Sequence, residues 1–202
     1  MKKLKLQDYL ALREGAEVLE RDPHGDKVLR LTDGTILKLF RRKRLLSSAT
    51  LRPYARRFVA NAGALARIGV PVPEVIGIHR VAELARDLVH YRPLPGATLR
   101  ELARQGLAPE RRARLRDSLS ALIVRLHDAG IYFRSLHIGN VIVMPDDQLG
   151  LIDFSDLRVH PWPLGRYLRA RNLRRMQGIA DERDWLDLDA VLGGRTPAAD
   201  GS

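Results

Sequence analysis

The chain has 202 residues and a formal net charge of +11 at pH 7, with 45% hydrophobic and 29% charged residues. This balance is typical of an ordinary globular protein with one good core or two small lobes. No apolar run approaches the roughly 18–20 residues of a membrane span, and no apolar segment follows the Met1-Lys2-Lys3 start. The absence of cysteine excludes disulfides and cysteine metal sites. We therefore expect a cytoplasmic protein without a transmembrane segment.

The positive charge is concentrated in three stretches, Arg41–Arg44, Arg111–Arg116 and Arg166–Arg175. Such surfaces attract polyanions, which include nucleic acid, anionic lipid headgroups and phosphorylated glycolipid. Aromatic residues make up only 5% of the chain, too few for base-stacking platforms, so nucleic acid is not the favoured partner. The arginine-rich patches predict an anionic glycolipid or a membrane surface as partner, and the alternative is a basic surface that is simply solvated.

The first third of the chain predicts an antiparallel sheet. Strands are expected at 16–20, 27–31 and 35–40, joined by turns at 21–26 and 32–34. Gly25 is the only glycine in the first turn. In the third strand, alternation places Lys38 on the face of Ile36 and Phe40. Lys38 is therefore either a functional lysine that faces a cleft or a lysine on an edge strand that faces solvent.

The middle of the chain predicts two further strands and several helices. Apolar residues at helical spacing favour a helix over 54–68, which Gly69 ends. Strands follow at 75–78 and 87–91, and Pro93 and Gly96 lie in a linker. Thr98 and Glu101 form the pattern of a capping box at the start of the next helix. A long helix is expected from Pro109 to His127.

The stretch from 123 to 157 organises the second half of the chain. Gly130 ends the long helix, a loop follows to Asn140, and strands at 141–144 and 149–152 form a hairpin that delivers Asp153. After it, a strongly basic helix is expected over 164–176 and a short helix over 184–192.

Within this stretch, Leu136-His137-x-Gly139-Asn140 is similar to the L-H-P-G-N run of aminoglycoside and choline kinases. Asp153-Phe154-Ser155 stands where the D-F-G of the protein-kinase-like fold would be. The resemblance implies an α+β, two-lobed protein-kinase-like fold. Its small antiparallel-sheet N-lobe would comprise residues 1–92, its trimmed and mainly helical C-lobe 93–192, and a flexible tail 193–202.

The resemblance also implies ATP and Mg²⁺ as cofactors. It assigns Asn140 and Asp153 to the metal, Lys38 and the backbone of Gly25 to the phosphates, and the backbone near Val89 and Tyr91 to adenine.

Three features depart from the family pattern. Ser135 stands where the family has its catalytic aspartate, and no Asp or Glu lies between Asp128 and Asp146. No Asp or Glu lies between Leu45 and Pro73 either, so the expected helix glutamate for the lysine is missing, and so is the Gly-rich loop. Ser135 and His137 are the side chains left at the catalytic positions. His137 either partly replaces the missing base or packs the loop.

The basic helix, with Arg166, Arg169, Arg171 and the run Asn172-Leu173-Arg174-Arg175-Met176, resembles the ending of the lipopolysaccharide-core kinases and the related InaA group. Members of this family phosphorylate inner-core sugars at the cytoplasmic face of the inner membrane, which implies a peripheral protein at that membrane. Three functions remain open. They are an ATP/Mg-dependent, weak phosphotransferase, a pseudokinase that regulates or scaffolds envelope biogenesis, and a basic interaction module without nucleotide binding.

Overall fold

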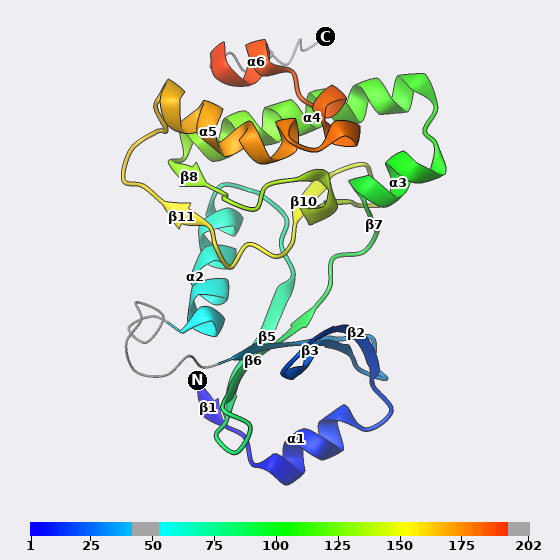
Figure 1. Cartoon of the computed structure of the whole chain (residues 1–202), viewed down its shortest axis with the longest axis vertical. Coiled ribbons are helices and arrows are strands. Elements are labelled where there is room, and N and C mark those ends of the chain that lie inside the picture. The colour runs from blue at the N-terminus through cyan, green and yellow to red at the C-terminus, as the bar shows by residue number, and fades with distance from the viewer. Residues whose placement is uncertain (42–52, 194–202) are drawn as a thin grey trace. The chain divides into compact units, whose positions relative to one another are not determined.

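The computed structural model describes residues 1–41 and 53–193 (Figure 1). The described residues form two compact units. The first comprises residues 1–63 and 73–93, and the second comprises residues 64–72 and the described residues from Leu94 onward. The protein is a mixed α+β protein with a multi-stranded sheet and several helices, as predicted. Residues 42–44 of the first basic stretch and the expected tail after Gly193 lie outside the described residues.

A six-stranded sheet, in the order β1-β5-β6-β4-β3-β2, forms the centre of the first unit. Its strands are β1 (Lys2–Lys3), β2 (Glu17–Asp22), β3 (Gly25–Arg30), β4 (Ile36–Arg41), β5 (Glu74–Val81) and β6 (Arg86–Arg92). Every neighbouring pair is antiparallel except β1 with β5. The five longer strands were predicted with somewhat different ends, and the two-residue β1 was not.

One face of this sheet packs against helix α1 (Leu6–Arg13). Tyr9 of the helix joins a buried cluster with Leu29, Leu31, Leu37, Leu39, Val81 and Leu88. The sequence analysis did not predict α1, although Leu6, Tyr9 and Leu10 lie at the i, i+3, i+4 spacing of one helical face, because the helix is only eight residues long. This cluster contains Leu37 and Leu39, the neighbours of Lys38 in β4, so it lies on the face of the sheet opposite to the Lys38 side chain.

The opposite face carries aromatic side chains. Phe40 of β4 stacks on Tyr54 at 6.2 Å between ring centroids and contacts Phe58 at 6.4 Å, and Phe58 stacks on Tyr91 at 5.5 Å. Tyr54 and Phe58 belong to helix α2 (Tyr54–Arg67), which the periodicity predicted. Gly69, with φ +70°, takes the left-handed conformation that ends this helix.

The second unit is mainly helical. Its helices are α3 (Leu99–Gln105), α4 (Pro109–Asp128), α5 (Arg166–Gln177) and α6 (Leu188–Gly193), with 3₁₀ segments η1 (Ile138–Asn140) and η2 (Ala180–Trp185). This unit also has two small sheets. One contains β7 (Ala97–Thr98), β9 (Val141–Val143) and β10 (Leu149–Leu151), and the other pairs β8 (Ile131–Tyr132) with β11 (Arg158–Val159). The predicted capping box of α3 is confirmed.

The predicted helix over 184–192 is wrong in its extent. The segment contains the end of η2 and the start of α6, and the buried residues Trp185 and Leu186 lie at the break. Since both side chains enter the core, the chain turns here instead of continuing one helix. Among the described residues, no helix combines the length and the apolar character that crossing a bilayer requires.

Candidate functional site

The loop from Ile131 to Asn140 is held in place by Asn172 of α5. The buried amide of Asn172 donates from Nδ2 to the carbonyl of Phe133 at 2.6 Å and accepts at Oδ1 from the N–H of Phe133 at 3.4 Å. The same Oδ1 lies 3.1 Å from Nε2 of His127, so this imidazole nitrogen must donate. Burial lowers the pKa of His127 to about 4, and the ring is therefore neutral.

Ser135, in the middle of the loop, makes two hydrogen bonds to residues outside its immediate neighbours. Its hydroxyl donates to Oδ1 of Asp156 at 2.8 Å, and its carbonyl accepts from Nδ2 of Asn140 at 3.0 Å. The sequence showed no carboxylate within the loop, and Asp156 brings one to it from beyond the hairpin. This residue was missed by the sequence reasoning. Its signal was a second aspartate three positions after Asp153, next to a loop that lacked one.

Asn140 and Asp153 lie on neighbouring segments. The carbonyl of Asn140 accepts from the N–H of Ile152 at 3.0 Å, which continues the ladder between β9 and β10 up to Asp153. Because Nδ2 of Asn140 is bonded to Ser135, the oxygen Oδ1 is the atom of this amide that suits a hard cation. Asp153 is exposed and has φ +52°, an uncommon value for a residue other than glycine. Such backbone outliers cluster at functional sites.

Asn140 and Asp153 are candidates for the protein's share of a metal–nucleotide complex. Within residues 1–41 and 53–193, no group of three or more His, Cys, Asp or Glu side chains is placed to hold a metal. Mg²⁺ is usually bound through one or two carboxylates together with substrate phosphates and water. Asn140 and Asp153 could supply the protein's share of that coordination.

His137 is engaged in a buried network beneath the loop. Its Nδ1 accepts from the N–H of Gly139 at 3.1 Å and faces Nη2 of Arg100 at 3.2 Å. Arg100 is paired with Glu182 of η2, a buried carboxylate that also accepts from the N–H of Ile138 at 3.2 Å. Burial and the neighbouring positive charges of Arg100 and Arg175 lower the pKa of His137. This arrangement favours the interpretation in which His137 packs the loop.

Lys38 lies in β4, an inner strand between β3 and β6. The residue is 9% exposed, and its Nζ lies 6.0 Å from the centroid of the Phe40 ring. The alternative of a solvent-facing lysine on an edge strand is therefore wrong. Helix α2 follows β4 in the chain and contains no carboxylate, and its buried polar residue is Asn61.

Gly25 begins β3, directly after the turn that joins β2 to β3. It lines a pocket of ≈ 340 Å³ together with Tyr9, Arg13 and Leu39, on the face that α1 packs against. The turn before it is fixed by Arg86, whose Nη2 donates to the carbonyl of His24 at 2.6 Å. A contact between the backbone of Gly25 and a phosphate stays a prediction.

Val89 and Tyr91 both lie within β6, which has neighbours on both sides. Val89 is aligned with Lys38 of β4 and Ile78 of β5. Tyr91 is aligned with Ile36 and Val75 in the same way. Because the backbone groups of an inner strand are used by the sheet, an adenine contact at these residues stays a prediction that requires the strand end to open.

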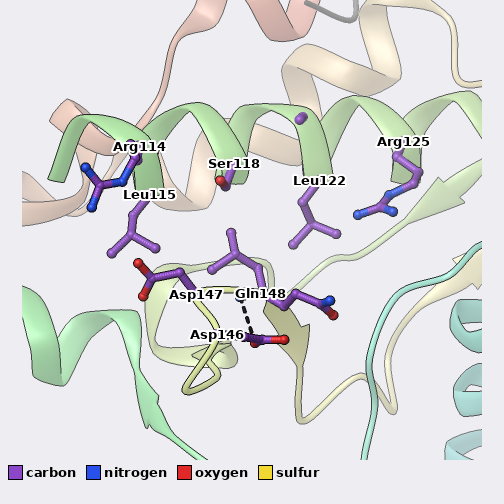
Figure 2. A pocket seen from close by; sticks show the side chains of 10 residues that line it. Arg114, Leu115, Ser118, Leu122, Arg125, Asp146, Asp147 and Gln148 are labelled. Atoms are coloured by element: carbon purple, nitrogen blue, oxygen red, sulfur yellow. Dashed lines mark hydrogen bonds between the residues drawn. The ribbon is translucent and has the colours of Figure 1, made fainter. Parts of the chain in front are cut away.

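Two pockets of the second unit differ in their position relative to the loop: one lies away from it and the other borders it. Figure 2 shows one of ≈ 410 Å³ between α4 and the β9–β10 turn, with Arg114 and Arg125 on the helix and Asp146 on the turn. No predicted site residue lines it. A second pocket of ≈ 620 Å³ is lined by Arg100, Ile138 and Glu182, so it borders the network beneath the loop.

No protein-family model matches the chain, and a search of curated proteins gives no significant match. The functional argument therefore rests on the residues themselves and on their geometry. In the second unit, the structure brings Ser135, His137, Asn140 and Asp153 to one loop and its adjoining hairpin, and it adds Asp156, Arg100 and Glu182.

Proposed function

We propose that the chain is a kinase-like phosphotransferase that uses ATP and Mg²⁺. The proposed acceptor is a sugar of the lipopolysaccharide core or a related envelope substrate, as the resemblance of the basic helix implies. The observation that carries the proposal is the hydrogen bond from Ser135 to Asp156. Kinases use a carboxylate at this loop position to accept the proton of the substrate hydroxyl, and Asp156 offers one there.

The order of the elements also supports a protein-kinase-like fold. A strand with a buried lysine is followed by a helix, and later by a loop asparagine, a β-hairpin and an aspartate. This is the order in which kinases place the phosphate lysine, the metal-binding asparagine and the metal-binding aspartate. The basic character of α5 adds support for an anionic acceptor.

In the proposed mechanism, bound ATP would supply the phosphoryl group and its Mg²⁺ would neutralise the charge that develops on that group. Asn140 and Asp153 would provide oxygen ligands to the metal, and Lys38 is the residue that we propose for phosphate oxygens. Asn140 also fixes Ser135, because its Nδ2 bonds the carbonyl of that residue. The proton of the acceptor hydroxyl passes to Oγ of Ser135 while the Ser135 proton passes to Asp156. General-base help of this kind contributes about 10²–10⁴-fold to a rate.

A pseudokinase that regulates or scaffolds envelope biogenesis is the second candidate. It is favoured by the missing Gly-rich loop and by the engagement of Val89 in the sheet. Both features remove contacts that a tightly bound nucleotide needs. A basic interaction module without nucleotide binding is the third candidate.

Two measurements, thermal unfolding and ATP turnover, separate these functions. Thermal unfolding with and without Mg-ATP reports binding, since ligand at 100 times its dissociation constant adds about 2.7 kcal/mol to the unfolding free energy. This corresponds to a rise of several degrees in melting temperature for a protein of this size. Binding without turnover supports the pseudokinase, and no Mg-dependent rise up to millimolar nucleotide supports the interaction module.

The kinase proposal is tested by Asp156→Asn. We expect ATP turnover to fall by about 10²-fold or more while Mg-ATP binding is retained. Asp117→Asn is the matched control, because Asp117 is an exposed residue in the middle of α4. Equal turnover in Asp156→Asn and Asp117→Asn would contradict the role of Asp156.

A further inference from the structure

Three large apolar side chains are exposed within one short segment of the second unit. Val159 is 54% exposed, Trp162 is 69% exposed and Tyr167 is 68% exposed. Pro161 and Pro163, which flank the tryptophan, are exposed as well. Figure 1 shows this segment running from β11 into α5. Large apolar side chains grouped in this way on a protein surface mark an interaction site.

The backbone of the segment is fixed although these side chains are exposed. The N–H of Leu164 donates to the carbonyl of His127 at 2.8 Å, and the N–H of His160 donates to the carbonyl of Gly130 at 2.8 Å. A Cβ on Gly130 would lie only 2.6 Å from the carbonyl oxygen of Trp162, so the loop lies directly against this glycine. The indole is therefore presented to solvent by an anchored loop.

The same segment is strongly basic. Helix α5 buries Arg169, Asn172, Leu173 and Met176 on one face. The opposite face carries Tyr167, with Arg171 four residues later and Arg174 seven residues later, so these three side chains lie together. Arg158, Arg166 and Arg175 are also exposed.

The sequence of the segment contains no acidic residue that could balance this charge. The sequence has no Asp or Glu from Leu157 to Ala180. Among the described residues, ion pairs are found for Arg169, which pairs with Asp128, but not for the five exposed arginines of the segment. We call the exposed residues of this segment, Val159, Trp162, Tyr167, Arg158, Arg166, Arg171 and Arg174, the Trp162 surface.

We propose that the Trp162 surface docks onto a bilayer that contains anionic phospholipid. Tryptophan and tyrosine favour the boundary between headgroups and acyl chains, because their rings are apolar and carry one polar atom. The surrounding arginines would bind the phosphates of the headgroups, as basic juxtamembrane segments do. A polyanion without hydrocarbon would satisfy the arginines but would leave Val159 and the two prolines without a partner. This docking does not depend on whether the chain transfers phosphate.

Intrinsic fluorescence tests the proposal directly, since the chain has two tryptophans. Trp185 is only 1% exposed, so a change in emission on binding reports Trp162. We expect vesicles of phosphatidylglycerol with phosphatidylcholine to shift the emission to shorter wavelength and to protect it from acrylamide quenching. Pure phosphatidylcholine vesicles should have little effect, and high salt should reverse the shift. An unchanged spectrum with the anionic vesicles would overturn the proposal.

Variants separate insertion from general charge attraction. In vesicle co-sedimentation, Trp162→Ala should weaken binding at least about tenfold, and Ile76→Ala, at an exposed apolar residue of β5, should not. Arg171→Glu/Arg174→Glu should abolish binding, whereas Arg104→Glu/Arg114→Glu, with the same change in net charge at exposed residues, should retain it. Equal loss in both pairs would overturn the assignment of the surface. So would a fluorescence shift with a single-stranded oligonucleotide but none with vesicles.

Discussion

The hydroxyl of Ser135 donates a 2.8 Å hydrogen bond to Asp156, which lies twenty-one positions further along the chain. The loop that contains Ser135 therefore gains a carboxylate that its own sequence lacks. A missing residue in a linear motif need not leave the site without that chemical group. The distance between the two residues in the sequence explains why the motif alone could not reveal the pair.

The first prediction concerns moving the carboxylate from Asp156 to position 135. Ser135→Asp alone places a second carboxylate within hydrogen-bond distance of Asp156, and two such groups hold one proton between them. We therefore expect little gain in turnover from this variant. Ser135→Asp/Asp156→Asn should instead recover most of the ATP turnover lost in Asp156→Asn, because it restores one ionised carboxylate at the loop. Steady-state ATP consumption measures all four proteins, and a double variant as slow as Asp156→Asn would contradict the proposed role.

The second prediction concerns the metal. Asp153→Ala removes the carboxylate at the end of the hairpin and should abolish the Mg²⁺-dependent rise in melting temperature with ATP. Asp117→Ala, at an exposed residue of α4, should leave that rise intact. Unchanged nucleotide binding in Asp153→Ala would show that Asp153 does not bind the metal.

The sequence predicted most of the fold because its signals are local. Alternating strands, the helix predicted over 54–68 with Gly69 and the Thr98–Glu101 capping box each depend on residues close together in the chain. Helix α1 was missed because an eight-residue segment shows the helical spacing of Leu6, Tyr9 and Leu10 only once, and Tyr9 packs into the sheet core. Strands of two residues, such as β8, are too short to show any periodicity.

Candidate site residues were predicted only where a sequence motif pointed to them. Asn140 and Asp153 were found from their spacing, and the structure places their segments side by side. The pairs Ser135–Asp156 and Arg100–Glu182 join side chains from segments 21 and 82 positions apart. Such pairs leave no periodic or spacing signal, so only the folded chain shows them.

The third prediction concerns the buried ion pair beneath the loop. Glu182→Gln keeps the shape of the side chain but removes the charge that balances Arg100. Removing one partner of a buried pair costs about 3 kcal/mol, and we expect a loss of unfolding free energy of this size in urea denaturation. Asp181→Asn, at the exposed neighbour, is the control and should change stability by less than about 0.5 kcal/mol. A stability loss in Glu182→Gln as small as that of the control would show that the pair does not stabilise η2 and the loop.

The fourth prediction compares two glycines. Gly130 has φ +72°, and a Cβ there would lie 2.5 Å from the carbonyl oxygen of His160. Gly130→Ala should therefore cost about 2 kcal/mol or more in unfolding free energy. Gly63 lies in α2, where an added Cβ meets no atom within 4 Å. Gly63→Ala should raise stability by about 0.5–1 kcal/mol, and urea denaturation measures both.

The fifth prediction is a loss of stability in mild acid caused by His127. Burial lowers the pKa of this imidazole from 6.5 to about 4, so between these values the unfolded chain binds a proton that the folded chain does not. The unfolding free energy is therefore unaffected by this group above about pH 7 and falls as the pH drops toward 4. At about 1.4 kcal/mol per pKa unit, the loss approaches about 3 kcal/mol.

His127→Gln separates this effect from that of other groups. Glutamine can still donate to Oδ1 of Asn172, but it does not titrate. Burial also lowers the pKa values of His79, His90 and His137, and these rings contribute a loss in the same direction in both proteins. The difference in unfolding free energy between wild type and His127→Gln should therefore shift by about 3 kcal/mol, in favour of the variant, as the pH falls from 7 to 4. A difference that stays constant over this range would mean that the pKa of His127 is the same in the folded and the unfolded chain, and it would contradict the lowering of this pKa by burial.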